Sequence, residues 1–346
     1  MSTESGRASW LSAWRIYTQA QTLRMFFLGF ASGLPLLLVL GTLSFWLREA
    51  GVELSTIGMV TWVGLAYGFK WAWAPLVDRL KLPILTAYFG RRRAWLLFSQ
   101  LAVTVCLVAM GLTDPQQNLK LMILFTALTA FFSATQDIAL DAYRIESAQL
   151  SEQAALAATY QTGYRLAMIW AGAGALALAA FFASTDSQYD PLAWQWAYMV
   201  MASSMVVGLV TVLLSPEPTR EVSRHTTELT ATRLQHCRQA HPDWSERKTR
   251  LVVWFYEAAC LPFIDFFSRY HWHAAVILAL VATYRISDVV MGVMANPFYQ
   301  DLGFSKEEVA AVSKVFGVVM TLFGAFIGGM ISTRLGVMKT LFLGGL

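Results

Sequence analysis

Two aspartates, Asp137 and Asp141, lie in an apolar stretch that is long enough to cross a lipid bilayer. They are four residues apart, so on an α-helix both carboxylates share one face, with Arg144 about one turn further along. An ionisable side chain at the centre of a bilayer costs at least about 2.5 to 3.5 kcal/mol, so it needs a partner or a function. The pair can hold a proton between its members, because ionising both carboxylates is costly. The alternative is a charge lock with neighbouring helices that never titrates.

Other ionisable residues also interrupt apolar stretches. Lys70 can pair with the aspartates or bind an anionic substrate, and the alternative is a side chain that snorkels from a span end. Arg285 and Asp288 are close enough in the sequence to pair with each other. We count Arg285 among the candidates for substrate binding and Asp288 among those for proton coupling or gating.

Arg165 lies about one third of the way into its apolar stretch, too deep to snorkel easily. Tyr160, Gln161 and Tyr164 precede it and form a polar, aromatic turn. Such a surface suits a sugar, because aromatic rings stack on its apolar face and a guanidinium group binds carboxylates. We therefore expect this group and Lys70 to line a central binding cavity between two halves of the protein. An interhelical polar contact is the alternative.

The elements that carry these residues are predicted to be membrane-spanning helices. Hydrophobic residues make up 56% of the 346-residue chain and charged residues only 14%, which is well below the roughly 25% of soluble domains. The apolar stretches show no alternation of period two, so helices rather than barrel strands are indicated. Spans are predicted at 23–47, 57–76, 95–112, 119–140, 154–182, 194–214, 272–298 and 309–331, with a ninth beginning near Met338. The predicted fold class is an all-α polytopic membrane protein.

The first span contains Ser32-Gly33-Leu34-Pro35. Gly33 and Pro35 predict a helix break, because discontinuous helices are common in transporters. A proline kink that serves only packing is the alternative.

Arginine and lysine cluster in alternate connectors, which places the N-terminus in the cytoplasm by the positive-inside rule. The long polar connector after the sixth span contains an apolar segment at 251–267, which we interpret as an amphipathic surface helix rather than an extra span. The predicted organisation is a cytoplasmic N-terminus (1–22), a six-helix transporter half (23–214), a cytoplasmic linker (215–270) and a partial second half (271–346).

A basic hairpin joins the second and third predicted spans. It contains Asp78, Arg79, Gly90, Arg91 and Arg92, and a similar glycine-containing basic turn returns at residues 329–336. Two related copies of one helical unit are typical of transporters.

Five segments resemble the AmpG-type muropeptide permeases of the major facilitator superfamily, in order and across essentially the whole chain. They are residues 29–35 (Gly-Phe-Ala-Ser-Gly-Leu-Pro), 69–79 (Phe-Lys-Trp-Ala-Trp-Ala-Pro-Leu-Val-Asp-Arg), 90–93 (Gly-Arg-Arg-Arg), 133–142 (Ser-Ala-Thr-Gln-Asp-Ile-Ala-Leu-Asp-Ala) and 216–218 (Pro-Glu-Pro).

The resemblance implies a multi-pass inner-membrane permease of the major facilitator fold. Such a permease imports N-acetylglucosaminyl-1,6-anhydro-N-acetylmuramic acid, with or without its peptide, for peptidoglycan recycling, driven by protons. A related transporter of another anionic metabolite, such as acetyl-coenzyme A, is the alternative. That superfamily has twelve spans, so we expect this chain to be a fragment or a truncated product.

An integral membrane enzyme is a competing interpretation, because Asp137 and Asp141 could bind a divalent metal. The spans supply few further carboxylates, and no catalytic motif occurs. We therefore expect a monomeric transporter in the lipid bilayer that is not an enzyme, has no cofactor or metal, and does not bind nucleic acid.

Overall fold

The computed structural model describes residues 18–149, 152–183, 189–218, 224–280, 283 and 317–345, and these residues form helices and turns without a β-strand. The predicted all-α class is confirmed. Contacts divide the chain into two compact units, residues 1–218 with 318–344 and 346, and residues 219–317 with 345. The predicted division into two transporter halves and a linker stays a prediction.

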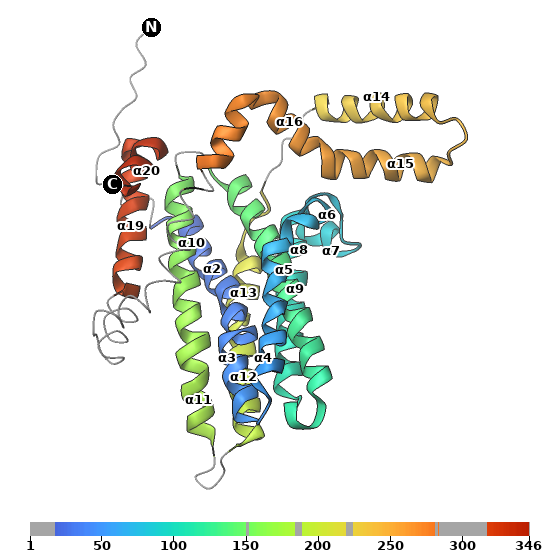
Figure 1. Cartoon of the computed structure of the whole chain (residues 1–346). Coiled ribbons are helices and arrows are strands. Elements are labelled where there is room, and N and C mark those ends of the chain that lie inside the picture. Colours follow the sequence, from blue (N-terminus) through green and yellow to red (C-terminus); the bar gives the residue numbers. More distant parts are fainter. Residues whose placement is uncertain are drawn as a thin grey trace. The chain divides into compact units, whose positions relative to one another are not determined.

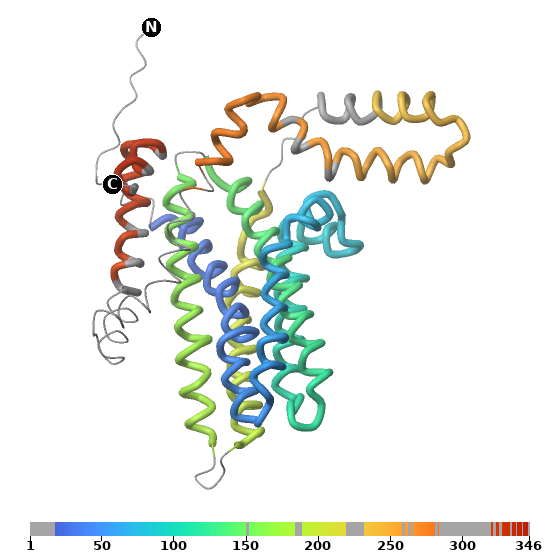
Figure 2. The backbone as a smooth tube through the Cα atoms, viewed as in Figure 1, coloured from blue at the N-terminus to red at the C-terminus, as the bar shows by residue number. Residues whose placement is uncertain are grey.

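The first unit contains a bundle of long apolar helices that run up and down between two ends (Figures 1 and 2). Five of its helical stretches are long and apolar enough to cross a membrane, counted over the described residues. The multi-pass prediction is confirmed. The stretches are α2 (Ala20–Val39) with α3 (Gly41–Glu49), α8 (Arg91–Gly111), α9 (Pro115–Ser147), α10 (Gln153–Ile169) with η3 (Trp170–Gly174) and α11 (Ala175–Phe182), and α12 (Pro191–Ser204) with α13 (Val206–Leu214).

The second predicted span, at 57–76, is a chain of short helical pieces rather than one helix. It comprises α4 (Leu54–Val60), η1 (Thr61–Gly64), α5 (Leu65–Phe69), η2 (Lys70–Ala72) and α6 (Ala74–Arg79), and both η elements are 3₁₀ helices. Glycines at 58, 64 and 68 weaken a regular helix, and Pro75 lacks the backbone N–H that would continue it. Residues 54–79 are thus helical almost throughout, as short consecutive pieces.

The break predicted at Gly33 and Pro35 is wrong in its position. Helix α2 continues through both residues, and the interruption lies at Leu40, whose φ is −114° and ψ is −90°. A proline inside a helix removes one backbone hydrogen bond. A membrane helix can tolerate this loss when a neighbouring helix packs closely against it. The neighbour here is α10, because a Cβ atom on Gly33 would lie 2.4 Å from the carbonyl oxygen of Tyr164.

Three glycines bring the backbones of α2 and α10 together. Besides Gly33, a Cβ on Gly29 would meet the Tyr160 carbonyl oxygen at 2.2 Å, and one on Gly163 would meet the Phe26 carbonyl oxygen at 2.0 Å. Small residues at this spacing let membrane helices approach closely. The contact fixes the face that α10 presents beside α2.

Aromatic side chains hold the other end of the bundle, where α3 meets α12. The rings of Trp46 and Trp194 stack with centroids 5.4 Å apart and planes at 7°. The Tyr198 hydroxyl donates to the Leu38 carbonyl oxygen at 2.8 Å, which satisfies a backbone group beside the break at Leu40. All three aromatic side chains are almost fully buried, so this end has a rigid core.

Two Asp-Pro steps begin helices at the same end. The side chain of Asp114 caps α9 and that of Asp190 caps α12, with proline in the first turn of each helix. Tyr189 donates its hydroxyl to Asp114 at 2.9 Å. Burial raises the pKa of the Tyr189 hydroxyl above its ordinary value, so the hydroxyl keeps its proton.

The second unit contains α14 (Arg224–Ala240), α15 (Glu246–Phe255), the π-helical η4 (Tyr256–Cys260) and α16 (Leu261–Tyr270). The segment predicted as an amphipathic helix at 251–267 is helical, and it is not among the candidate spans found in the described residues. Residues 272–280 are helical. Towards the end of the chain, α19 (Gly317–Leu335) and α20 (Val337–Gly345) are joined at Gly336, whose φ of +83° nearly equals the +82° of Gly90 before α8. Each of the two basic turns therefore has a glycine at positive φ, a region that glycine favours.

Candidate functional site

Asp137 is a buried carboxylate in the apolar part of α9. Asp137 is only 7% exposed, and it lies in a helix that is apolar enough to cross a membrane. Asp141, one turn later, keeps 45% of its side chain exposed. The two carboxylates therefore have different surroundings although they share one helix face.

Lys70 bridges the two carboxylates. Its Nζ lies 3.7 Å from Asp137 Oδ2 and 3.9 Å from Asp141 Oδ2, and its side chain is one-third exposed. Arg144 adds a second cation 3.5 Å from Asp141. Two cations therefore balance two carboxylates, which reduces the cost of holding charge inside the bundle.

Helix α2 supplies a hydroxyl to the same carboxylate. Ser32, which is 1% exposed, donates to Asp137 Oδ1, and its Oγ lies 3.4 Å from the Tyr160 hydroxyl on α10. The Ser32 hydroxyl had no predicted role. Its small size and its place beside Gly33 were the available signals, but only packing against α9 and α10 reveals the contact.

The broken second span presents Tyr67 and Lys70 to the same region. Tyr67 lies near Ser133 and Asp137, and the hydroxyls of Tyr67 and Ser133 are both buried. Trp73 donates its indole N–H to Thr135 on α9 at 3.1 Å, which fixes the segment that carries Lys70. We call Ser32, Tyr67, Lys70, Ser133, Asp137, Asp141 and Tyr160 the carboxylate cluster.

Arg165 lies beside the carboxylate cluster without joining it. Its side chain is exposed and forms no ion pair among the described residues, so Arg165 is not paired with Asp137 or Asp141. Tyr160 and Tyr164 form one stripe of α10, with ring centroids 5.9 Å apart, and Gln161 and Arg165 form the adjacent stripe. Tyr164 interacts electrostatically with both Asp137 and Arg165. Arg165 therefore lies on the stripe of α10 next to the one that carries Tyr160, and not on the stripe that contacts Ser32.

At the end of the bundle that carries the basic hairpin, Arg92 joins three elements. Its guanidinium group contacts Asp78 Oδ1 at 2.7 Å and Glu146 Oε1 at 2.6 Å, and it is almost buried. Arg91 also reaches Glu146, at 3.3 Å, and donates to the Asp78 carbonyl oxygen at 2.6 Å. The hairpin thereby ties α6 and α8 to the end of α9. Arg79, the last residue of α6, takes part in further interactions.

Glu217 caps the first turn of α8 from a distant part of the sequence. Its carboxylate accepts the backbone N–H groups of Arg92 at 2.8 Å and Arg93 at 3.0 Å. A negative charge is favourable at a helix N-terminus, where backbone N–H groups are otherwise unpaired. Gly90 leaves room for this contact, since a Cβ there would lie 2.4 Å from the Glu217 side chain. We call Asp78, Arg91, Arg92, Glu146 and Glu217 the hairpin cluster.

The structure brings Lys70, Asp137 and Asp141 together as one group, and Gly90, Arg91, Arg92 and Asp78 as another. The sequence did not predict that Ser32, Glu146 and Glu217 are hydrogen-bond partners in these groups. The Pro-Glu-Pro step at 216–218 was the one available signal for Glu217. Arg285 and Asp288 lie outside the described residues. Asp137 and Asp141 are not part of any group of at least three His, Cys, Asp or Glu residues suited to a metal ion within the described part.

Comparison with known protein families settles the class of the molecule. The family model of the Major Facilitator Superfamily matches residues 25–346. The chain belongs to this superfamily. The predicted fold is therefore confirmed at the level of the superfamily, and the carboxylate cluster lies within the matched region.

Two curated relatives refine the position of the chain within the superfamily. The candidate transporter AmpG 4 of Rickettsia felis is 32% identical over 332 residues, which cover 96% of this chain and 72% of the relative. The anhydromuropeptide permease of Escherichia coli K12 is 34% identical over 333 residues, which cover 96% of this chain and 59% of the permease. The predicted resemblance to AmpG-type proteins is confirmed. An uncharacterized protein of Haemophilus influenzae is similar as well, at 33% identity over 322 residues.

Replacing Lys70 by methionine tests whether its charge stabilises Asp137. The variant keeps an apolar chain of similar length but leaves the buried carboxylate without its cation, so we expect a loss on the order of 2 kcal/mol. The loss is measured as a lower midpoint temperature of unfolding in detergent.

The double variant Lys70→Met with Asp137→Asn should recover most of this stability, because it removes the unpaired charge. Lys120→Met, on an exposed part of α9, is the matched control and should change little. Equal losses in the single and double variants would show that Lys70 contributes only through its aliphatic chain.

Proposed function

We propose that this protein imports anhydro-muropeptides, a disaccharide of N-acetylglucosamine and 1,6-anhydro-N-acetylmuramic acid with or without its peptide, across the bacterial inner membrane. The similarity to the Escherichia coli anhydromuropeptide permease supports the substrate class. The observation that carries the mechanism is the buried Asp137, held by Lys70 and Ser32 inside an apolar bundle. An ionisable side chain in that position is costly, and such residues in membrane proteins usually serve a function.

We infer proton symport, which the chemistry of the carboxylate cluster supports. When Asp137 or Asp141 takes up a proton, its attraction for Lys70 is lost and the bridge between η2 and α9 weakens. The half-exposed Asp141 offers the proton a route from water, and the buried Asp137 can hold it. Protonation would therefore loosen the broken second span from α9, which is the kind of change that alternating access requires.

In this proposal, side chains of α10 beside the carboxylate cluster bind the substrate. Anhydro-muropeptides present apolar sugar faces, hydroxyls and carboxylates. Tyr160 and Tyr164 can stack on the sugar, Gln161 can bind hydroxyls, and Arg165 is available for a carboxylate because it forms no ion pair in the described structure. The buried hydroxyls of Tyr67 and Ser133, which lie near Asp137, can add further hydrogen-bonding groups.

Uptake of radiolabelled anhydro-disaccharide into membrane vesicles tests the function. We expect accumulation that disappears when the proton gradient is collapsed. Asp137→Asn and Asp141→Asn should each abolish accumulation against a gradient, because asparagine keeps the hydrogen-bonding shape but cannot carry the proton.

Asp243→Asn, at an exposed position of the second unit, is the matched control and should behave as the unchanged protein. Accumulation that persists in both aspartate variants would disprove the coupling role. Labelled acetyl-coenzyme A taken up in place of the disaccharide would instead assign another anionic substrate.

Arg165→Lys keeps the positive charge and removes the planar fork of donors. We expect the apparent KM for a peptide-bearing substrate to rise about tenfold, because a bidentate contact to a carboxylate is lost. Membrane levels should not change, since Arg165 is exposed and makes no ion pair with the rest of the described chain.

The disaccharide without peptide provides an internal comparison, because it carries fewer carboxylates and should be less affected. Arg250→Lys, in the exposed ion pair with Glu246, is the control. An unchanged KM in Arg165→Lys and in Tyr164→Phe would assign this part of α10 to helix packing.

We also propose that the N-terminus and the 215–270 connector are cytoplasmic, because arginine clusters in both. A cysteine at Thr227 should then resist a membrane-impermeant thiol reagent added from the periplasm. A cysteine at Ser187, which lies outside the described residues, should react. The reverse labelling pattern would invert the orientation.

A further inference from the structure

Two of the long helical stretches in the first unit depart from regular α-helical geometry at the same level, and nothing in the proposed transport cycle uses this feature. The first predicted span is interrupted at Leu40, between α2 and α3. The fifth predicted span contains the π-helical turn η3 (Trp170–Gly174), between α10 and α11. The Thr42 hydroxyl donates to the Ala171 carbonyl oxygen at 2.7 Å, so the two irregularities lie side by side. Helices bend at such turns, and π-helical turns are frequent at functional sites.

The start of η3 is held from two sides. Besides the bond from Thr42 to Ala171, Trp170 donates its indole N–H at 3.1 Å to the hydroxyl of Ser204, the last residue of α12. The later part of the turn contains Gly172 and Gly174, and glycine has the greatest backbone freedom of all residues. The turn is therefore fixed at its start and permissive at its end, which is the property of a pivot for α11.

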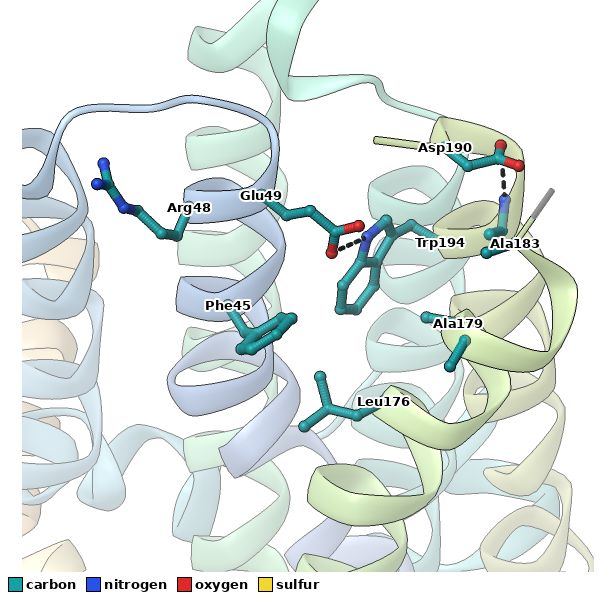
Figure 3. A pocket seen from close by; sticks show the side chains of 10 residues that line it. Phe45, Arg48, Glu49, Leu176, Ala179, Ala183, Asp190 and Trp194 are labelled. Carbon is teal, nitrogen blue, oxygen red and sulfur yellow. Dashed lines mark hydrogen bonds between the residues drawn. The ribbon is translucent and has the colours of Figure 1, made fainter. Parts of the chain in front are cut away.

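Beyond this contact, a cavity of about 600 Å³ opens between α3, α11 and the start of α12 (Figure 3). Phe45 of α3, Leu176 of α11 and Trp194 of α12 border it, whereas Arg48 points away from it (Figure 3). Apart from Leu176, the side formed by α11 and its C-cap consists of alanines, and their small side chains leave the space empty. These alanines are Ala179, Ala180 and Ala183.

The α3 side of the cavity is firmly attached to α12. Trp46 stacks on Trp194, and the Glu49 carboxylate accepts the indole N–H of Trp194 at 3.1 Å (Figure 3). Tyr198, on the same helix as Trp194, donates to the Leu38 carbonyl oxygen beside the break. Helices α3 and α12 therefore form one rigid wall.

Helix α11, by contrast, has no side chain that can form a hydrogen bond. Its residues 175–182 are Ala-Leu-Ala-Leu-Ala-Ala-Phe-Phe, so all its side-chain contacts are apolar. One of them is the contact between Phe182 and Trp196 of α12, whose ring centroids are 6.4 Å apart. Apolar contacts are non-directional, so packed helices can slide over one another by small distances. The element that is free to move against the wall is therefore α11.

We propose that α11 is a hinged arm, which pivots at η3 and swings into the cavity during the transport cycle. In the closed position, Leu176 and the alanines of the arm pack against Phe45 and the wall formed by α3 and α12. Closure buries apolar surface and removes a void, and both effects favour it. The open position gains the freedom of the glycine-containing turn.

This inference rests on the proposed transport function, because the arm continues the span that carries the proposed substrate face. Tyr164 lies six residues before Trp170, which corresponds to about 9 Å along a helix. A substrate that binds one position of the arm better than the other shifts the equilibrium between them. With a cytoplasmic N-terminus, the arm belongs to the periplasmic end of the bundle, from which an imported substrate enters.

The distance between two spin labels on the protein in lipid nanodiscs tests the arm. One label replaces Phe181 near the end of α11, and the other replaces Arg48 on the wall, after the three native cysteines are changed to alanine. We expect two distances, with the shorter one gaining population when anhydro-disaccharide is added. A single distance that neither the disaccharide nor a change of pH alters would overturn the proposal.

Ala180→Leu fills the cavity from the arm itself. It should remove the shorter distance and lower the maximal rate of disaccharide uptake about fivefold, with little change in KM, because the conformational step is blocked. Ala177→Leu is the matched control, since Ala177 is exposed on the same helix but does not line the cavity. Equal effects of the two substitutions would contradict closure of the cavity.

Gly172→Ala acts at the pivot and leaves the cavity unchanged. The added Cβ would lie 3.3 Å from Leu37 Cδ1, the end of a flexible side chain, so the variant should fold. We expect slower uptake with both distances retained, because alanine reduces the backbone freedom of the turn. Gly58→Ala in α4, where a Cβ would meet no atom within 4 Å, is the control, and equal rates in both variants would rule out a pivot at η3.

The two measurements separate the arm from the transport function on which it rests. If the unchanged protein takes up no disaccharide into vesicles, the proposed function is wrong. The label distances, compared at mildly acidic and mildly alkaline pH, then still decide whether α11 moves.

Discussion

A single buried carboxylate determines how the helices of the first unit must be arranged. Asp137 is 7% exposed in an apolar helix, so its charge has to be neutralised from neighbouring elements. Lys70 comes from the broken second span and Ser32 from α2, and both must reach the same two oxygens of α9. Loss of either contact would leave an uncompensated charge in a medium with little water. Three elements are thereby held in register by one side chain.

The close contact between α2 and α10 makes that arrangement possible. Gly29, Gly33 and Gly163 let the two backbones approach until no Cβ would fit between them. Ser32 lies among these glycines, and the same contact brings the Tyr160 hydroxyl to 3.4 Å from its Oγ. Glycine is unfavourable within a helix by itself, so its use here reflects packing rather than helix propensity. The glycine contact and the buried carboxylate support each other, because each fixes the position of Ser32.

The sequence predicts where most spans lie and which ionisable residues are candidates for the site. It does not predict which residues contact those candidates in the folded protein. Apolar length predicts α2, α8, α9 and α10 because a bilayer demands it. It does not reveal that residues 57–76, although apolar and helical, are divided into short pieces by glycines and Pro75. Partners such as Ser32 and Glu217 depend on contacts between residues more than one hundred positions apart, and no local pattern encodes them. Depth in a span also does not tell what a side chain faces, and Arg165 is exposed without an ion pair among the described residues.

Helix α9 connects the two charged clusters mechanically. Asp137 and Glu146 lie nine residues apart on one continuous helix, which corresponds to about 13 Å along its axis. The carboxylate cluster holds one end of this segment to Lys70, while Arg91 and Arg92 hold the other to the basic hairpin. A helix of this length moves as a rigid rod, so a shift that follows loss of the Lys70 contact would also act on the Glu146 contacts. One continuous helix therefore carries both clusters, and in the proposed mechanism it would couple loss of the Lys70 contact to the contacts of the hairpin.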